Sequence, residues 1–378
     1  MNDPEFLLAR LVSIDSVNPS LVPGARGEAQ IGDFVAEWMR GQGLEVHRQE
    51  TAAPGRTNVI AVARGSGGGR SLMLNAHMDT VGVAGMKVPF EPVVRDGRMS
   101  GRGSMDTKAA LAAFMCAAVE APARRLRGDV ILTAVVDEEY ASLGTEAVVR
   151  EWKADAAIVG EPSGLQIVTE HKGFVWFQVD TEGVAAHGSL PDVGVDAILM
   201  MGKVLAGIED LGTRLRRSAP HSTLGTGSLH ASLITGGQEL SSYPASCRLD
   251  IERRTIPGET PDTAEAEIRA VIDAIAAREP GFKATVRRTF ARGSMEARRD
   301  SPIVLCLARQ FQKATGNAPI FAGMSGWLDS ALLDGAGIPT VVLGPVGSGL
   351  HGEEEWVDLD SVRACRDIIL GTIEEFCR

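Results

Sequence analysis

The stretch SLMLNAHMDT, residues 71–80, ends an apolar run with a histidine and an aspartate. Ser71–Ala76 is predicted to be a strand, and His77 and Asp79 follow where that strand would end. Three more strand-like runs flank it in the sequence: Asn58–Ala63, Val130–Val136 and Ala156–Val159. The alanine-rich segment Met105–Val119 is predicted to be a helix between two of these runs. This alternation predicts an α/β domain whose mixed, largely parallel sheet has helices on both faces.

The pattern changes after about residue 170. Six segments now follow in the order strand, helix, strand, strand, helix, strand: Phe174–Thr181, Val195–Leu211, Gly227–Ile234, Tyr243–Arg253, Asp262–Arg278 and Ala284–Phe290. This order is typical of a ferredoxin-like α+β unit.

Segments of the first kind return towards the C-terminus. Ser301–Thr315 is predicted to be a helix with Ser301 as its cap and Pro302 at its first position. Pro339–Leu343 is a short strand and Leu359–Phe376 a closing helix. A smaller domain is therefore predicted to be inserted into a larger one. The larger domain comprises residues 1–171 and 290–378, and the insertion comprises residues 172–289.

The composition is that of a globular protein, with 44% hydrophobic and 23% charged residues among 378. A formal net charge of −11 argues against nucleic acid or an anionic membrane as the main partner. The N-terminus MNDPEFLLAR lacks the basic start of a secretory signal. Five scattered cysteines without CxxC spacing are expected to be reduced thiols. These features predict a cytoplasmic location.

Potential metal ligands occur in five loops. The motifs are LNAHMDT with His77, GRGSMDTK with Asp106, VVDEEY with Glu138 and Glu139, IVGEPS with Glu161, and GPVGSGLHGEEEW with His351. Each motif alone also fits an ordinary role, such as a first-turn acid of a helix or a solvated acidic loop. Taken together, they predict that the loops converge on a cation, because clustered carboxylates repel one another without one. Nitrogen and carboxylate ligands without thiolate suit Zn²⁺ and tolerate Mn²⁺ or Co²⁺.

In their order and spacing these motifs resemble those of the co-catalytic zinc amidohydrolases and peptidases. That family includes acetylornithine deacetylase, succinyl-diaminopimelate desuccinylase, aminoacylase and glutamate carboxypeptidase. The resemblance extends over nearly the whole chain, from LNAHMDTV to HGEEEW. It implies a catalytic domain with an inserted lid and dimerisation domain, and hence a homodimer.

The resemblance also implies a role for each motif residue. His77, Asp106 and Glu161 would bind one divalent ion, and His351, Glu139 and the shared Asp106 the other. Asp79 would hydrogen-bond His77 and fix its tautomer. Glu138 would be the general base.

Three further residues are implied from the inserted domain. His187, in GVAAHGSLPDVGVDAI, would stabilise the oxyanion in its own subunit or in a neighbouring one. Arg254 would bind the substrate carboxylate, with Arg253 as the alternative, because neighbouring residues of a strand point apart. Ser241 stands where the family usually has a substrate-binding asparagine. In SGWLDSALL, Trp327 and Leu328 replace smaller or polar residues.

The predicted function is metal-dependent hydrolysis of the amide bond of an N-acyl amino acid. A metallo-dipeptidase or carboxypeptidase of the same family is the close alternative. A non-catalytic relative that binds metal or an amino acid is a third hypothesis. A nucleotide-dependent oxidoreductase is excluded because no glycine-rich stretch forms GxGxxG between a strand and a helix.

Overall fold

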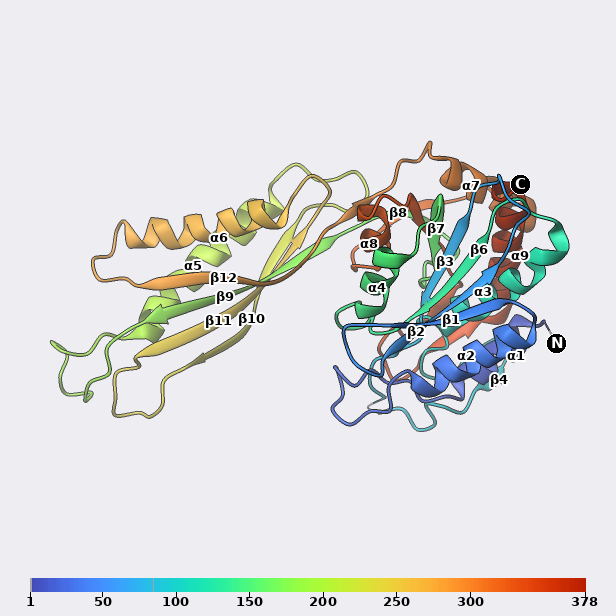
Figure 1. Ribbon diagram of the computed structural model, residues 1–378. Coiled ribbons are helices and arrows are strands. Elements are labelled where there is room, and N and C mark those ends of the chain that lie inside the picture. Colours follow the sequence, from blue (N-terminus) through green and yellow to red (C-terminus); the bar gives the residue numbers. More distant parts are fainter. Residues whose placement is uncertain (1, 84) are drawn as a thin grey trace. The chain divides into compact units, whose positions relative to one another are not determined.

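The computed structural model describes residues 2–83 and 85–378 (Figure 1). The chain forms two compact units. The first comprises Met1–Thr169, Ala297–Ala322 and Leu328–Arg378, and the second comprises Glu170–Glu296 and Gly323–Trp327. The chain therefore leaves the first unit, builds the second and returns. After this return, the short segment Gly323–Trp327 again belongs to the second unit, although the residues on both sides of it belong to the first.

The first unit is built on a sheet in the order β1-β2-β6-β3-β7-β15-β8-β13, with β14 also paired to β8. The strands are β1 (Glu45–Glu50), β2 (Thr57–Ala63), β3 (Leu72–His77), β6 (Val130–Val135), β7 (Ala156–Val159), β8 (Ile167–His171), β13 (Met295–Glu296), β14 (Phe321–Met324) and β15 (Thr340–Val342). The four central strands β6, β3, β7 and β15 are parallel, whereas β1, β2 and β8 pair antiparallel with their neighbours. The central strands are buried along their whole length, which explains their unbroken apolar runs.

Helices of the first unit pack against this sheet or against other helices (Figure 1). They are α1 (Pro4–Val12), α2 (Ala29–Gly41), α3 (Lys108–Glu120), α4 (Leu143–Glu151), α7 (Pro302–Thr315), α8 (Ser330–Gly335) and α9 (Leu359–Phe376), with a 3₁₀ turn at Ala121–Arg124. Helix α3 is buried nearly throughout and packs on α1, α9 and strand β3. Its alanines allow this close packing. The predicted mixed, largely parallel α/β fold is thus confirmed.

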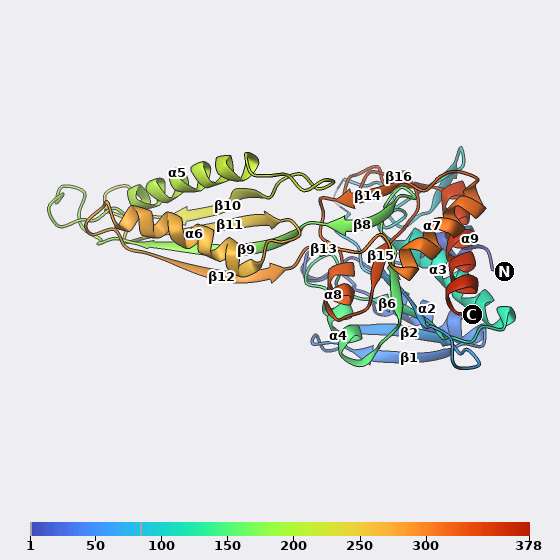
Figure 2. The same ribbon diagram turned by 90° about the horizontal axis from the view of Figure 1, so that it is seen from above.

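The second unit consists of β9 (Gly173–Glu182), α5 (Ala197–Arg216), β10 (Ser228–Gly236), β11 (Ser246–Thr255), α6 (Pro261–Ala276) and β12 (Ala284–Arg292). Its antiparallel sheet has the order β10-β11-β9-β12, as in the ferredoxin-like fold that was predicted. Figure 2 shows α5 and α6 on one side of this sheet. Buried and more exposed residues alternate along β11, because only one face is covered.

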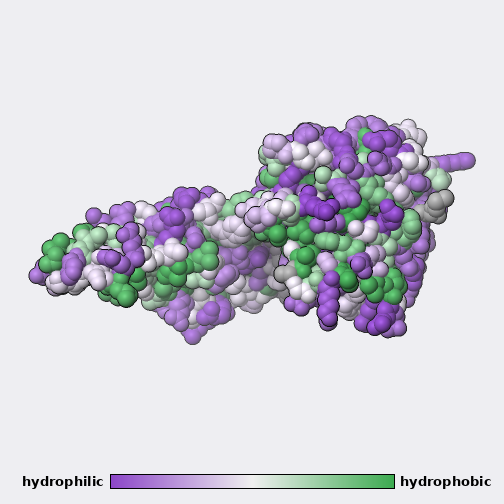
Figure 3. Space-filling view, turned by 90° about the horizontal axis from the view of Figure 1, so that it is seen from below, coloured by the Kyte–Doolittle hydropathy of each residue, from purple (hydrophilic) through white to green (hydrophobic). Residues whose placement is uncertain are grey.

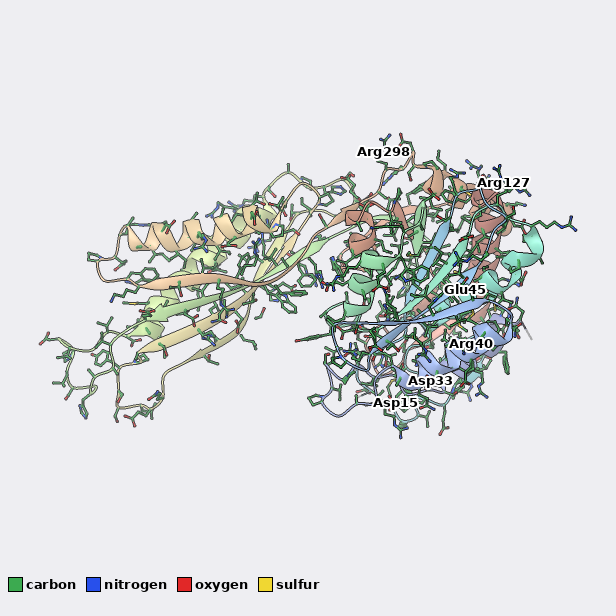
Figure 4. The ribbon with its side chains drawn as sticks, viewed as in Figure 1. Asp15, Asp33, Arg40, Glu45, Arg127 and Arg298 are labelled. Atoms are coloured by element: carbon green, nitrogen blue, oxygen red, sulfur yellow. The ribbon has the colours of Figure 1, made fainter. Side chains whose placement is uncertain are left out.

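Several details differ from the predictions. Ser301 is the N-cap residue of α7 and Pro302 its first residue, as predicted, but the Ser301 hydroxyl has no hydrogen-bond partner among the described residues. Strand β1 is absent from the predictions because its sequence, EVHRQE, is polar. It is an edge strand whose Glu45 pairs with Arg64 at 2.8 Å, and Figure 4 shows Glu45 on the first unit. A small additional sheet contains β16 (Gly347–Ser348), β17 (Trp356–Asp358), β5 (Arg98–Ser100) and β4 (Val93–Arg95).

No helix within residues 2–83 and 85–378 combines the length and apolarity needed to cross a bilayer. All five cysteines are free and buried.

Candidate metal centre

The parallel strands of the first unit deliver their polar residues to one edge of the sheet. Strand β3 ends at His77, β6 leads into Asp137–Glu139, β7 leads into Glu161, and β15 precedes the loop that carries His351. The ends of parallel strands meet at the same edge, where α/β proteins form their sites. This topology brings together side chains that are far apart in the sequence.

Asp106 lies at the centre of the cluster and faces a different histidine with each carboxylate oxygen. Its Oδ1 is 3.1 Å from Nε2 of His77, and its Oδ2 is 3.4 Å from Nε2 of His351. Glu161 approaches Nε2 of His77 to 3.9 Å, and Glu139 approaches Nε2 of His351 to 3.2 Å. Asp106 and Glu161 thus both lie beside His77, and Asp106 and Glu139 both lie beside His351.

The potential ligand atoms lie close enough together to coordinate the same metal ion. One ligand atom from each of His77, Asp106 and Glu139 lies within 4.8 Å of the others, and the same holds for His77, Glu138 and Glu161. Two ligands on one zinc ion, each about 2.0–2.2 Å from it, lie roughly 3–3.6 Å apart. The buried Oε1 of Glu139 has no hydrogen-bond partner among the described residues. The cluster therefore fits a divalent metal by spacing, by ligand chemistry and by its unsatisfied oxygen.

Negative charge is concentrated in this cluster. Burial raises the pKa values of Glu138, Glu139 and Glu161, and the charges of neighbouring carboxylates raise them further. Burial would also raise the pKa of Asp106, but hydrogen bonds from His351 and His77 outweigh it and lower the pKa. The same contacts, to Asp106 and Glu139, raise the pKa of His351 to about 10. So many carboxyl groups in one place favour a bound cation.

Asp79 contacts His77 through its main-chain oxygen, and its carboxylate has other partners. Nδ1 of His77 lies 3.0 Å from the main-chain oxygen of Asp79 but 3.6 Å from its carboxylate, which is too long for a hydrogen bond. The carboxylate instead accepts from the main-chain N–H groups of Glu138 at 3.1 Å and Glu139 at 3.2 Å, and from Asn18 at 2.8 Å. Asp79 therefore positions the loop that carries the two glutamates.

A second hydrogen-bond network, which the sequence did not predict, also positions the loop that carries Glu138 and Glu139. Asp137 has a left-handed φ of 67°, and its Oδ1 accepts from Arg56 at 2.7 Å and from Asn18 at 3.1 Å. Arg56 also forms an ion pair with the buried Glu28. These partners come from distant segments without a recognisable motif, so no local signal could have identified them.

Glu355 links the loop of Asp106 to the loop of His351. Its buried carboxylate accepts from Arg102 at 2.7 Å and from the main-chain N–H groups of Gly103, Met105 and Asp106 at 2.9, 2.8 and 3.1 Å. Arg102 also donates to the main-chain oxygen of Gly352 at 2.9 Å. Residues 101–107 consequently form turns, and α3 begins at Lys108 rather than at the predicted Met105. The motif GLHGEEEW contains this residue, but its sequence indicates a role only for the histidine.

Replacing Glu355 with alanine is expected to loosen both loops. The change leaves Arg102 buried without its partner, at a cost of about 3–5 kcal/mol in the free energy of unfolding. Affinity for zinc should fall roughly 10–100-fold, as when the supports of metal ligands are lost. Denaturant unfolding and zinc titration against a competing indicator measure the two effects. The exposed Glu354→Ala is the matched control, and equal behaviour of the two variants would contradict the assigned role.

The remaining predicted site residues lie in the second unit. His187 is exposed, and its Nδ1 is 2.8 Å from the Ser189 hydroxyl. The main chain of His187 pairs with Ser242, and Gly188 donates to the main-chain oxygen of Ser241 at 2.7 Å. His187 and Ser241 are thus brought together at the loop between β10 and β11.

Arg254 lies at the other end of β11. Its side chain is 30% exposed and donates through Nε to Glu252 at 2.7 Å. Arg253 points to the opposite face, where it is buried and paired with Glu259 and Glu267. Between the two arginines, only Arg254 has a side chain that an external carboxylate can reach.

An α/β sheet with a carboxylate–imidazole cluster at its edge and an inserted ferredoxin-like unit is the arrangement expected of a metal-dependent enzyme. The chain belongs to peptidase family M20/M25/M40, whose sequence profile matches residues 73–375.

Curated relatives and solved structures are similar over nearly the whole chain. An acetylornithine deacetylase from Myxococcus xanthus is 29% identical, covering 98% of this chain and 96% of the relative. An N-formyl-4-amino-5-aminomethyl-2-methylpyrimidine deformylase from Bacillus subtilis is 28% identical, covering 94% and 91%.

Among solved structures, the aminopeptidase PepT from Bacillus cereus has a TM-score of 0.81 at 21% identity, covering 99% of this chain and 98% of that one. A Bacillus subtilis protein described as a dinuclear metal-binding peptidase of the M20 family has a TM-score of 0.74 at 16% identity, covering 99% and 97%. The chain is therefore a hydrolase of this family with a divalent-metal site.

Proposed function

We propose that the protein hydrolyses the amide bond of N-acyl amino acids with two divalent ions. The observation that carries this proposal is the position of Asp106, whose two oxygens face separate histidines, each of which also approaches a glutamate. His77, Asp106 and Glu161 would hold one ion, and His351, Glu139 and Asp106 the other. Zinc suits this ligand set, and cobalt or manganese is also compatible. Such ions, when bound, supply acidification of water and polarisation of a carbonyl group.

Glu138 is the general base in this proposal. Its main chain is held by Asp79, and its carboxyl group lies beside those of the metal ligands. Burial and the charge of Glu161 raise its pKa, which suits a group that accepts a proton from water and passes it to the leaving amine. The neighbouring Glu139 is a metal ligand in this proposal.

Arg254 binds the α-carboxylate of the substrate, and His187 stabilises the oxyanion, with Ser241 beside it. Ser246, the first residue of β11, and Arg254, the residue before its last, are eight residues apart, which corresponds to roughly 26 Å along a strand. His187 lies near the first end and Arg254 at the second, so one small substrate cannot contact both in the same second unit. We therefore assign His187 to the site of a neighbouring chain in a homodimer.

The second unit also offers a surface for such a dimer. Strand β10 is the edge of its sheet, and Leu233 and Ile234 on it are 67% and 52% exposed. Figure 3 shows apolar residues gathered at the surface of this unit. An uncovered edge strand with apolar side chains favours pairing with another chain. This role as a dimerisation domain is part of the proposal.

Complementation between two inactive variants tests the assignment of His187. Co-expressed His187→Ala and Glu138→Gln chains should recover about a quarter of wild-type activity, since half of the dimers are mixed and each has one complete site. Each variant expressed alone is the control. If co-expression recovers no activity while mixed dimers form, His187 acts within its own chain.

A metallo-dipeptidase or carboxypeptidase is the second candidate, because the structural relatives include an aminopeptidase. Both reactions cleave a carbonyl–nitrogen bond, and the metal ligands do not distinguish them. As the location we propose the cytoplasm, since all five cysteines are free.

A substrate screen with the zinc-reconstituted protein tests the proposed function. The screen compares N-acetyl, N-succinyl and N-formyl amino acids with dipeptides, each with and without a chelator. We expect N-acyl amino acids to be hydrolysed and the chelator to abolish turnover. Turnover of dipeptides alone would establish the second candidate, and full activity after rigorous metal removal would refute metal-dependent hydrolysis.

A further inference from the structure

Arg254 lies on the sheet face that the helices of the second unit leave open. On β11, the side chains of Leu249, Ile251 and Arg253 are buried towards α5 and α6, so Glu252 and Arg254 point the other way. Figure 2 shows both helices on a single side of this sheet. Whatever binds Arg254 therefore also meets the residues beside it on the open face.

Those neighbours are aromatic. Phe174 on β9 is directly opposite Arg254 in the register, and Trp176 follows on the same face. The rings of Phe174, Trp176, Phe290 and Trp327, here called the aromatic patch, pack with centroid distances from 5.2 to 6.0 Å. Trp176 is 37% exposed although its ring is large and apolar. The patch thus presents aromatic surface next to the guanidinium group.

Positive charge surrounds the aromatic patch. The guanidinium carbon of Arg254 is 5.3 Å from the ring centre of Phe174, and that of Arg292 is 4.5 Å from Phe290 and 5.5 Å from Trp327. Burial and the charge of Arg254 lower the pKa of the nearby Lys172. The positive charges of these groups disfavour a further cation beside the patch, whereas an aromatic ring can stack on it.

A carboxylate beside Arg254 on this face is already engaged. Glu252 accepts from Nε of Arg254 at 2.7 Å and from the indole N–H of Trp176 at 2.9 Å, one bond to each oxygen. Nη1 of Arg254 is buried and has no hydrogen-bond partner among the described residues. Arg254 thus has a donor that no described residue satisfies, and its neighbour Glu252 is held between Arg254 and Trp176.

We propose that the aromatic patch is the subsite for the amino-acid side chain, so that the enzyme prefers N-acyl derivatives of aromatic amino acids to those with cationic side chains. This inference rests on the proposed function, in which Arg254 binds the α-carboxylate. The side chain branches from the carbon next to that carboxylate, so it must lie within reach of the rings around Arg254. Phe174, Trp176 and their neighbours are then specificity-determining residues.

The test compares kcat/KM of the zinc-loaded full chain for N-acetyl-L-phenylalanine, N-acetyl-L-tryptophan, N-acetyl-L-alanine and N-acetyl-L-ornithine. We expect the aromatic substrates to exceed the other two by at least about tenfold. Trp176→Ala should lower the ratio of phenylalanine to alanine substrates about tenfold, mainly through KM. Thr285→Ala, an exposed residue of β12, is the control that should leave the ratio unchanged.

A preference for the ornithine or alanine substrate, or an equal loss on all substrates in Trp176→Ala, would overturn the assignment of the subsite. Binding of N-acetyl-L-phenylalanine to the metal-depleted protein, measured by calorimetry, distinguishes a failure of the subsite proposal from a failure of the proposed function. If no amide is hydrolysed while binding persists and weakens in Trp176→Ala, the subsite stands and the proposed reaction fails. If amides are hydrolysed without an aromatic preference, the reaction stands and the subsite fails.

Discussion

Replacing Glu138 with glutamine is expected to reduce kcat about a thousandfold, within the range found when a general base is lost. Glutamine keeps the size of the side chain but cannot accept a proton from water. The main-chain N–H of residue 138 still donates to Asp79, so the loop should keep its position. Because Glu139 and Glu161 are unchanged, metal binding should remain close to that of the wild type.

Steady-state kinetics and metal content per chain measure this outcome together. Glu151→Gln, at an exposed position at the end of α4, is the matched control and should leave both quantities unchanged. Near-normal activity in Glu138→Gln would remove Glu138 from the role of base. Loss of metal in parallel with activity would instead make it a ligand, which its place in the group with His77 and Glu161 allows.

Replacing Asp106 with alanine should be more severe, since it removes a ligand from both predicted ions at once. Both histidines lose their central partner, at 3.1 and 3.4 Å in the present structure. We expect kcat/KM to fall by at least about a thousandfold, because bound ions supply several kcal/mol of transition-state stabilisation. Metal content should fall well below two ions per chain.

Elemental analysis after dialysis against zinc measures the stoichiometry, and circular dichroism verifies that the variant is folded. Asp360→Ala serves as the control because its carboxylate is 86% exposed and lies on α9. Two tightly bound ions in Asp106→Ala would show that this residue does not bridge them.

Much of the architecture could be predicted from local sequence. The strands β3, β6 and β7 are buried on both faces, and burial of that kind demands an unbroken apolar run. The edge strand β1 could not be found in this way, because EVHRQE forms its ladder with main-chain groups and leaves most of its side chains at least partly exposed. The ferredoxin-like unit was predictable from the order of its elements.

The site was predictable only in part, because only some of its residues lie in local sequence motifs. His77, Asp106, Glu139, Glu161 and His351 stand in short motifs at element ends, so each could be identified locally. The side chains that position these residues could not be identified from local sequence. Asn18 and Arg56 reach the acidic loop from segments without any motif, and Glu355 binds the loop of Asp106 across about 250 positions of sequence.

The sequence by itself determined which side chains could bind a metal and in which kind of fold they would lie, since both depend on residue type and local pattern. The tertiary structure alone decided how they are combined. The parallel order of β6, β3, β7 and β15 places their ends together, so that Asp106 faces two histidines. Likewise, only the pairing of β9, β11 and β12 surrounds Arg254 with aromatic rings. Spatial neighbours that are remote in the chain carry no local signal, because their contact is created only when the chain folds.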